Sequence, residues 1–398
     1  MVKIAAVGTG SIFQRMHLPS YPSVEGAELV ALVDVSDQSL KATKKLMLQL
    51  YEDRAKELET VDPDRAELLR AAASSIKTYS SLEAALGAEQ IDLLDVCTPP
   101  KYHEQVVDAI KRGVGVMVEK PMAYSYIEAK RIWDAVKENH GFYQHNEQEI
   151  FDPFYYTSRK VVQGGGVGEP LLVSVSFAHY GPENRKWFWD WTVSGGGALV
   201  DMATHSITVG WFLAGFEKRI AQVRTVAPHG ISQRMSDRLI DGRFRSFEVE
   251  DDAHLELRLE GEKGDWVTLL AEGSWSGRDS IPFMVQGTAG VIKGEPENRK
   301  LEVVDAFGYE REVAVPKWNS FEMELSNAVS CVNDGTRSIS DEDIGLQTTV
   351  AMGAAYLSEL KGRVAVTPEE FRDFAETFDS GEELVKALIK GVKRGDNS

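Results

Sequence analysis

Short apolar runs divide the first part of the chain, and each of them ends at polar or turn-forming residues. The runs are residues 4–7, 29–33, 93–97 and 115–118. Runs of this length are typical of strands that are buried on both faces of a sheet. Helical patterns lie between them, and one apolar stripe is formed by Ala129, Ile132, Trp133 and Val136. This alternation predicts a Rossmann-type α/β domain over residues 1–145, with a doubly wound parallel sheet and a ligand site at the carboxyl ends of its strands.

Residues 38–75 form a longer connection than a compact α/β domain needs between two of its strands. Leucine and other apolar positions recur there at helical spacing, and Asp62-Pro63 is a helix-start signal. The segment therefore predicts an inserted helical hairpin. A substrate lid or a subunit contact is compatible with this pattern, and a solvated decoration is the interpretation that we favour.

The second half of the chain changes character, because several of its apolar segments alternate with period two and are separated by glycine turns. These expected strands are residues 171–178, 220–226, 254–259 and 266–271. Helices are expected at residues 319–334 and 341–361, followed by a charged tail, 367–398, with one or two short helices and a frayed end. The pattern predicts an α+β domain over residues 146–398, built on a large, mostly antiparallel open sheet for substrate binding and oligomerisation.

Composition and charge narrow the possible partners. With 44 basic and 62 acidic residues the net charge is −18, which disfavours nucleic acid and anionic membranes as partners. The apolar run at 195–216 is interrupted by Asp201 and His205, so we expect a buried core helix there and no membrane span. The chain has only two cysteines, and its first expected strand begins at Lys3, where a signal peptide would stand. Both observations predict a cytoplasmic protein.

A partial dinucleotide fingerprint follows the first apolar run. Its residues are Gly8, Thr9, Gly10, Ser11, Ile12 and Phe13, with Phe13 where a third glycine is usual. Asp34 ends the second run, where a carboxylate accepts hydrogen bonds from ribose hydroxyls and repels a 2′-phosphate. The combination predicts NAD binding, with NADP less favoured. The alternative is a pair of turn glycines with an unrelated surface aspartate.

Two further segments carry candidate chemistry. Glu119-Lys120-Pro121 follows a buried strand, although an ordinary surface lysine is the simpler interpretation of that segment alone. After the glycine run at 195–197, Asp201 and His205 stand at i and i+4, which places them on one face of a helix. A carboxylate beside an imidazole suits a general base, and a purely structural pair is equally compatible.

Aromatic residues cluster just before that glycine run. Trp187 and its aromatic neighbours stand beside Arg185 and Asp190. Such a mixture suits the binding of a sugar ring, and packing in a core or an interface is equally compatible with it.

Taken together, these segments resemble the glucose–fructose oxidoreductase, inositol dehydrogenase and rhizopine-catabolism (Gfo/Idh/MocA) family over nearly the whole chain. The matching stretches are the glycine turn, Asp34, Thr98-Pro99-Pro100-Lys101-Tyr102-His103, Glu119-Lys120-Pro121, Asn146, Asp152-Pro153, Gly168-Glu169-Pro170, Gly195 to His205, Glu250-Asp251-Asp252-Ala253 and Glu272-Gly273-Ser274-Trp275. Phe13, the insert at 38–75 and the tail depart from the family pattern.

The resemblance implies functions for individual residues. The catalytic group would be Lys120, Asp201 and His205. Cofactor contacts would come from Gly8, Gly10, Ser11, Ile12, Phe13, Asp34, Thr98, Pro99, His103, Glu119, Lys120 and Asn146. Substrate contacts would come from Lys120, Asn146, Arg185, Trp187, Asp201 and His205. No metal is expected, and a homodimer or homotetramer would pack through the open sheet.

The expected activity is NAD-dependent oxidation of a secondary hydroxyl of a sugar, a sugar derivative or a cyclitol. In this mechanism His205 removes the hydroxyl proton, Lys120 stabilises the developing negative charge, and Asp201 orients His205 or holds a neighbouring hydroxyl. Two alternatives remain: a redox-neutral glycosidase that retains NAD, and a non-catalytic regulator that senses nucleotide or sugar on the same fold. Retention of the three candidate catalytic residues argues against the regulator.

Overall fold

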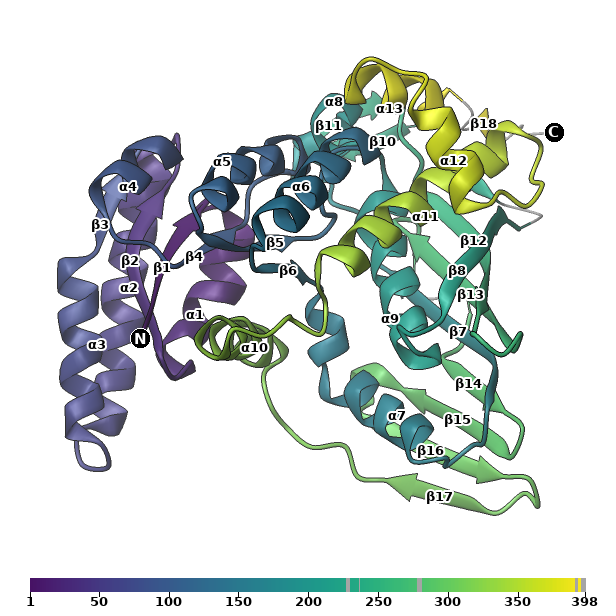
Figure 1. The fold of residues 1–398 in the computed structure, drawn as a ribbon, viewed down its shortest axis with the longest axis horizontal. Coiled ribbons are helices and arrows are strands. Elements are labelled where there is room, and N and C mark those ends of the chain that lie inside the picture. Colours follow the sequence, from purple (N-terminus) through teal and green to yellow (C-terminus); the bar gives the residue numbers. More distant parts are fainter. Residues whose placement is uncertain (227–229, 236, 278–280, 391–392, 395–398) are drawn as a thin grey trace. The chain divides into compact units, whose positions relative to one another are not determined.

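The computed structural model describes residues 1–226, 230–235, 237–277, 281–390 and 393–394. The chain divides into two compact units, and Figure 1 shows their elements. The first unit comprises Met1–Glu119, Arg131–Gln148 and Trp318–Glu342. The second comprises Lys120–Lys130, Glu149–Lys317 and Asp343–Ser398. The return of the segment from Trp318 to the first unit was not predicted from the sequence.

The first unit is built on a six-stranded parallel sheet with the strand order β3-β2-β1-β4-β5-β6. Its strands are β1 (Val2–Val7), β2 (Ala27–Val33), β3 (Lys77–Tyr79), β4 (Leu93–Val96), β5 (Gly115–Glu119) and β6 (Tyr143–Asn146). Every residue of β4 and β5 is buried, as expected for parallel strands covered on both faces. The strand order runs outward from β1 in both directions, so the predicted doubly wound class is confirmed.

Helices cover this sheet and extend from it. They are α1 (Leu18–Ser20), α2 (Asp37–Leu58), α3 (Pro63–Ser75), α4 (Leu82–Ala88), α5 (Val106–Lys111), α6 (Tyr126–Asn139), which belongs to this unit from Arg131 onward, and α10 (Ser320–Asp334). The predicted hairpin is confirmed, because α2 and α3 pack against each other and the Asp62 carboxylate accepts a hydrogen bond from the Arg65 N–H at the start of α3 (Figure 1). On α10, Leu325, Ala328 and Val329 join the core of the first unit.

The second unit is built on a ten-stranded, mostly antiparallel sheet, which confirms the predicted class. Along the sheet the order is β17-β16-β15-β14-β7-β13-β12-β9-β18, with β8 paired to β12. The strands are β7 (Pro170–Ala178), β8 (Arg219–Thr225), β9 (Ile231–Gln233), β12 (Asp252–Glu260), β13 (Trp266–Ser274), β14 (Met284–Gly287), β15 (Gly290–Glu295), β16 (Lys300–Asp305), β17 (Glu310–Val313) and β18 (Lys393–Arg394). A separate hairpin pairs β10 (Asp237–Ile240) with β11 (Arg243–Ser246).

Helices pack against this sheet, and α9 is central among them. The helices of the second unit are α7 (Pro153–Gln163), α8 (Trp191–Ser194), α9 (Thr204–Ala214), α11 (Glu342–Leu360), α12 (Pro368–Ala375) and α13 (Gly381–Ile389). Every residue of α9 is buried, and the helix packs on β7 and β13. The apolar run at 195–216 is therefore part of a core, as predicted. None of the helices in the described part of the chain combines the length and hydrophobicity needed to span a bilayer.

The sequence patterns missed some elements. The four strands from β14 to β17 and the β10–β11 hairpin were not predicted, because these segments are short and several are interrupted by glycine or rich in charge. In the tail, the two expected short helices are α12 and α13. The expected frayed end is partly wrong, because β18 pairs in parallel with β9. Residues 395–398, to which the expectation also applied, lie outside the described residues.

Candidate active site

The glycine turn after β1 has the geometry that a dinucleotide requires. Gly8 has a φ of +88°, and a Cβ built on it would lie 2.7 Å from Thr98 Cγ2 and 2.8 Å from the Thr98 nitrogen, so only glycine fits there. A Cβ on Gly10 would meet nothing within 4 Å, which leaves open space beside the backbone. This is the arrangement by which a glycine turn lets a pyrophosphate approach backbone N–H groups, so the residues present fit NAD.

A cavity of about 910 Å³ adjoins this turn at the carboxyl ends of β1, β2 and β4. Its volume is within the range of small-molecule and cofactor sites. Among the predicted cofactor residues, those that line it are Gly8, Gly10, Asp34, Thr98 and Pro99. The sequence therefore predicted a set of residues that the fold brings around one cavity of the first unit.

Asp34 has a second task that the sequence did not reveal. Its Oδ2 accepts hydrogen bonds from the Thr9 N–H at 2.8 Å and from Thr9 Oγ1 at 3.0 Å, and its Oδ1 accepts one from the Ser36 N–H at 2.8 Å. The carboxylate thus holds the glycine turn in place while it lines the cavity. Each carboxylate oxygen can accept more than one hydrogen bond, so these contacts leave room for the predicted ribose hydroxyls.

The remaining predicted cofactor residues differ in accessibility. Phe13 is fully buried and packs near Tyr21 and His17, so its side chain is part of the core. His103 is also buried, and its Nε2 lies 2.7 Å from the Thr98 carbonyl oxygen, across the loop that follows β4. Any contact of Phe13 with a cofactor would therefore come from its backbone.

Other residues of the predicted set lie along the same unit. Ser11 is exposed and Ile12 half-buried at the start of the helix after the glycine turn. Glu119 ends β5, and Asn146 ends β6 with its side chain buried. Asn146 Oδ1 accepts a hydrogen bond from Gln144, whereas its Nδ2 has no hydrogen-bond partner among the described residues.

The predicted catalytic group lies in the second unit and contains a short ion pair. Lys120 Nζ donates to Asp201 Oδ1 at 2.9 Å and to the Asp201 backbone oxygen at 2.6 Å. Trp275 Nε1 donates to Asp201 Oδ2 at 2.9 Å, and His179 Nε2 lies 3.7 Å from the same oxygen. Burial opposes ionisation, but Lys120, His179 and Trp275 together hold the pKa of Asp201 well below its usual range.

His205 lies in the first turn of α9 and is 5% exposed. Its ring centroid is 5.3 Å from that of Phe177 on β7. The segment before it, Leu199–Ala203, is π-helical and leads directly into α9, so both Asp201 and His205 lie in helical structure. The Asp201 side chain accepts hydrogen bonds from Lys120 and Trp275, and an orienting role toward His205 stays a prediction.

Glu250 holds the start of this helical segment. Its Oε1 accepts hydrogen bonds from the N–H groups of Gly197 and Leu199, each at 2.9 Å, and from the Tyr356 hydroxyl at 2.8 Å. A Cβ on Gly197 would lie 1.9 Å from the Glu250 backbone oxygen, which explains why glycine stands there. Glu250 thus positions the element that carries Asp201, and this role was not predicted.

Glu250 should make stability pH-dependent. Burial raises the pKa of Glu250 from 4.5 to about 7 despite the hydrogen bonds that it accepts. The folded chain therefore keeps a proton that the unfolded chain releases above pH 4.5. The free energy of unfolding should therefore be highest at low pH and should fall by about 3 kcal/mol as the pH rises from 4.5 to about 7.

Chemical denaturation at pH 5 and pH 8 checks this expectation. Glu250→Gln should flatten the pH dependence of the free energy of unfolding relative to the unsubstituted protein, because glutamine does not titrate. Glu248→Gln, at an exposed position two residues earlier, is the control. An unchanged pH dependence in Glu250→Gln would contradict the assignment.

The predicted sugar-binding aromatics form a partly buried group. Trp187 stacks on Phe188 with ring centroids 3.8 Å apart, and the Arg185 guanidinium lies 6.0 Å from the Phe188 ring centroid. Trp189 is buried, and its Nε1 donates to the Pro182 carbonyl oxygen. Trp189 therefore packs in the core, while Arg185 and Trp187 remain half-buried candidates for substrate contact.

Two residues beside Asp201 escaped prediction as site residues. Trp275 and Asp201 are 74 positions apart, and His179 is just beyond the end of β7. No local spacing connects these residues, because they meet only when β7 and β13 pair in the sheet. Trp275 was part of the family resemblance, but its hydrogen bond to Asp201 was not expected.

The fold and the site define an oxidoreductase with an NAD-binding Rossmann domain. Residues 2–147 match the family described as "Oxidoreductase family, NAD-binding Rossmann fold", and residues 155–293 match the "GFO/IDH/MocA C-terminal domain". The chain belongs to the Gfo/Idh/MocA family.

Several relatives of the chain are named as dehydrogenases. D-apiose dehydrogenase of Paraburkholderia graminis is 22% identical over 391 residues, 91% of this chain and 88% of the relative. Inositol 2-dehydrogenase 3 of Saccharopolyspora erythraea is 26% identical over 65% of this chain and 66% of its own. Among solved structures, levoglucosan dehydrogenase in complex with NADH and L-sorbose has a TM-score of 0.73 at 17% identity, covering 94% of this chain and 100% of that one. This structural likeness supports the fold.

Proposed function

We propose that this protein is an NAD-dependent dehydrogenase that oxidises a secondary hydroxyl of a sugar, a sugar derivative or a cyclitol. The observation that carries the proposal is the Lys120–Asp201 ion pair, which lies in the same unit as the buried His205. A protein that only senses a nucleotide needs no such group. The relatives named for apiose and inositol support the substrate class.

The three residues would divide the work at one hydroxyl group. His205 would remove the hydroxyl proton, and the Lys120 ammonium would donate a hydrogen bond to the same oxygen as negative charge develops on it. Asp201 would fix the position of Lys120 through the 2.9 Å ion pair. Bound NAD would supply the acceptor for the hydride that leaves the carbon.

Additional residues would recognise the rest of the substrate. We infer that Trp187 offers an aromatic face to a sugar ring and that Arg185 and Asn146 donate hydrogen bonds to its hydroxyls. The half-buried state of Arg185 and Trp187 supports this role, since each retains some accessible surface. Asn146 Nδ2 is buried and has no hydrogen-bond partner in the described part of the chain, so its hydrogen-bonding capacity is unused there.

We also propose that the protein is cytoplasmic and forms a homodimer or homotetramer through its open sheet. Cys97 and Cys331 are both free and buried, which suits a reducing compartment. Light scattering with size-exclusion chromatography measures the assembly. Substitution of exposed residues on the large sheet should shift it toward the monomer.

The proposed function is tested by incubating the purified protein with NAD and a panel of sugars, sugar acids, glycosides and cyclitols. NADH formation at 340 nm, stoichiometric with substrate loss, is the expected result. A glycosidase that retains NAD would release a cleaved sugar without accumulating NADH. NAD binding without turnover of any compound in the panel would contradict the dehydrogenase.

Asp34 should make the protein prefer NAD to NADP. A 2′-phosphate placed beside this carboxylate meets an unpaired like charge, so NAD should bind at least about tenfold more tightly. Titration of both cofactors by quenching of tryptophan fluorescence measures the ratio. Asp34→Ala should reduce the preference for NAD over NADP. Asp37→Ala, at an exposed position paired with Lys41, should leave the preference unchanged. Equal affinities in the unsubstituted protein would remove Asp34 from this role.

A further inference from the structure

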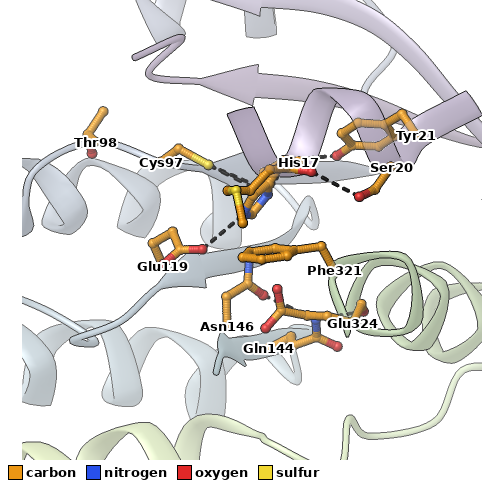
Figure 2. A network of polar contacts seen from close by, with 12 residues as sticks. His17, Ser20, Tyr21, Cys97, Thr98, Glu119, Gln144, Asn146, Phe321 and Glu324 are labelled. Carbon is orange, nitrogen blue, oxygen red and sulfur yellow. Dashed lines mark hydrogen bonds and ion pairs between the residues drawn. The ribbon is translucent and has the colours of Figure 1, made fainter. Parts of the chain in front are cut away.

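A buried cluster in the first unit brings together ligand-type side chains from three elements. His17 ends a π-helical turn, Glu119 ends β5, and Glu324 lies on α10. His17 and Glu324 are 0% exposed and Glu119 is 7% exposed. One nitrogen of His17 and one oxygen each of Glu119 and Glu324 lie within 4.8 Å of one another. Figure 2 shows these side chains together with their neighbours.

The two nitrogens of His17 have different surroundings. Nδ1 lies 3.1 and 3.0 Å from the two carboxylate oxygens of Asp95, and Nε2 lies 2.8 Å from Glu119 Oε1. Asp95 also accepts a hydrogen bond from the Tyr21 hydroxyl at 2.8 Å, which fixes its orientation. A histidine held at one nitrogen by a carboxylate presents its other nitrogen in the manner of a metal ligand.

Glu324 is the least satisfied member of the cluster. Both of its carboxylate oxygens are buried, and neither has a hydrogen-bond partner among the described residues. The carboxylates of Glu119, Glu147 and Asp95 and the imidazole of His17 are close enough to interact electrostatically with Glu324. A buried carboxylate in this setting requires a compensating positive charge or a proton.

We propose that His17, Glu119 and Glu324 bind a divalent transition-metal cation through His17 Nε2 and one oxygen of each carboxylate. An imidazole with two carboxylates suits Zn²⁺ or Mn²⁺, whereas Mg²⁺ prefers oxygen ligands alone. Ligand atoms about 2 Å from a shared cation lie about 3–4 Å apart, so small side-chain rotations complete the site.

The cation would have a structural role within the first unit. It would connect α10 to β5 and to the π-helical turn that follows the dinucleotide fingerprint. In the sequence, α10 is far from the rest of the first unit. The ring of Phe321, with its centroid 5.5 Å from that of His17, packs against the site. This role is independent of the proposed dehydrogenase activity.

Metal analysis of the whole, untagged protein tests the site. After dialysis against metal-free buffer, mass spectrometry should find about one Zn²⁺ or Mn²⁺ per chain. If the metal has been lost, the chelator-treated protein should bind one equivalent of added Zn²⁺ in a calorimetric titration, and its melting temperature should rise. Mg²⁺ at the same concentration should produce neither effect. Absence of both bound and added metal would overturn the proposal and would mean that protons neutralise the cluster.

Substitutions locate the binding. Glu324→Gln keeps the volume and should weaken Zn²⁺ binding at least about tenfold, and Asp95→Asn should weaken it by about 10- to 100-fold through the loss of orientation at His17. Glu322→Gln, on the same helix and less buried, is the matched control. His254→Gln tests the other histidine–carboxylate cluster, Asp252, His254 and Glu272. Loss of binding in His254→Gln with full binding in Glu324→Gln would overturn the assignment.

Discussion

Replacement of His205 by alanine should lower turnover by about 10²- to 10⁴-fold and leave NAD affinity nearly unchanged. The reason is the division of tasks between the two units. The glycine turn and Asp34 belong to the first unit, whereas His205 lies on α9 of the second and serves only the proton transfer. Loss of a general base therefore removes a step of the chemistry and leaves the cofactor contacts intact.

Turnover, NAD affinity and melting temperature are to be measured on one preparation of the variant. His140→Asn, at an exposed position that has a positive φ tolerated by asparagine, is the matched histidine control and should retain full turnover. A purely structural His205 would lower the melting temperature while the folded fraction kept a normal rate. A folded, NAD-binding His205→Ala protein with near-normal turnover would exclude His205 as the base.

Replacement of Lys120 by methionine should abolish most of the activity and also destabilise the protein. Turnover should fall by about 10²- to 10⁴-fold, because the hydrogen bond to the developing oxyanion is lost. The free energy of unfolding should fall by about 3 kcal/mol, because Asp201 keeps its charge in a site where its side chain is only 14% exposed. The double substitution Lys120→Met with Asp201→Asn should recover most of the stability and none of the activity.

The pH dependence of unfolding distinguishes this pair from a surface contact. Since the folded-state pKa of Asp201 lies below its ordinary value of 3.8, its contribution to stability is present above that pH and is lost as the pH falls further. Acid denaturation of the double variant should lack this contribution. Lys263→Met, in an exposed turn, is the control. Full turnover in Lys120→Met would contradict the proposed mechanism.

The sequence alone was sufficient to predict those strands, turns and helix starts that depend on neighbouring residues. The runs at 93–97 and 115–118 are short and apolar at nearly every position, as strands covered on both faces are, and they correspond to β4 and β5. Asp62-Pro63 marked the start of α3 because an aspartate cap and a proline at the first position both satisfy a helix N-terminus locally. Gly8 and Gly10 were recognisable for a similar reason, since the tight turn constrains residue type directly.

Tertiary structure decided which distant groups meet. Lys120 and Asp201 were each predicted, but their 2.9 Å contact depends on how the chain returns after 81 residues. Trp275 reaches Asp201 through the pairing of β13 with its neighbours, and Glu250 reaches Gly197 across 53 positions. The π-helical turn at Leu199–Ala203 is likewise a feature that no residue pattern signals.

The buried cluster of His17, Glu119 and Glu324 illustrates the same limit most clearly. Each residue is unremarkable in its own segment, and the chain separates Glu324 from His17 by more than three hundred positions. Their proximity follows from the return of α10 to the first unit. Local patterns report whether a side chain faces a core, because that depends on periodicity. Which charges share that core depends on the assembled fold, because only long-range packing places them within reach of one another.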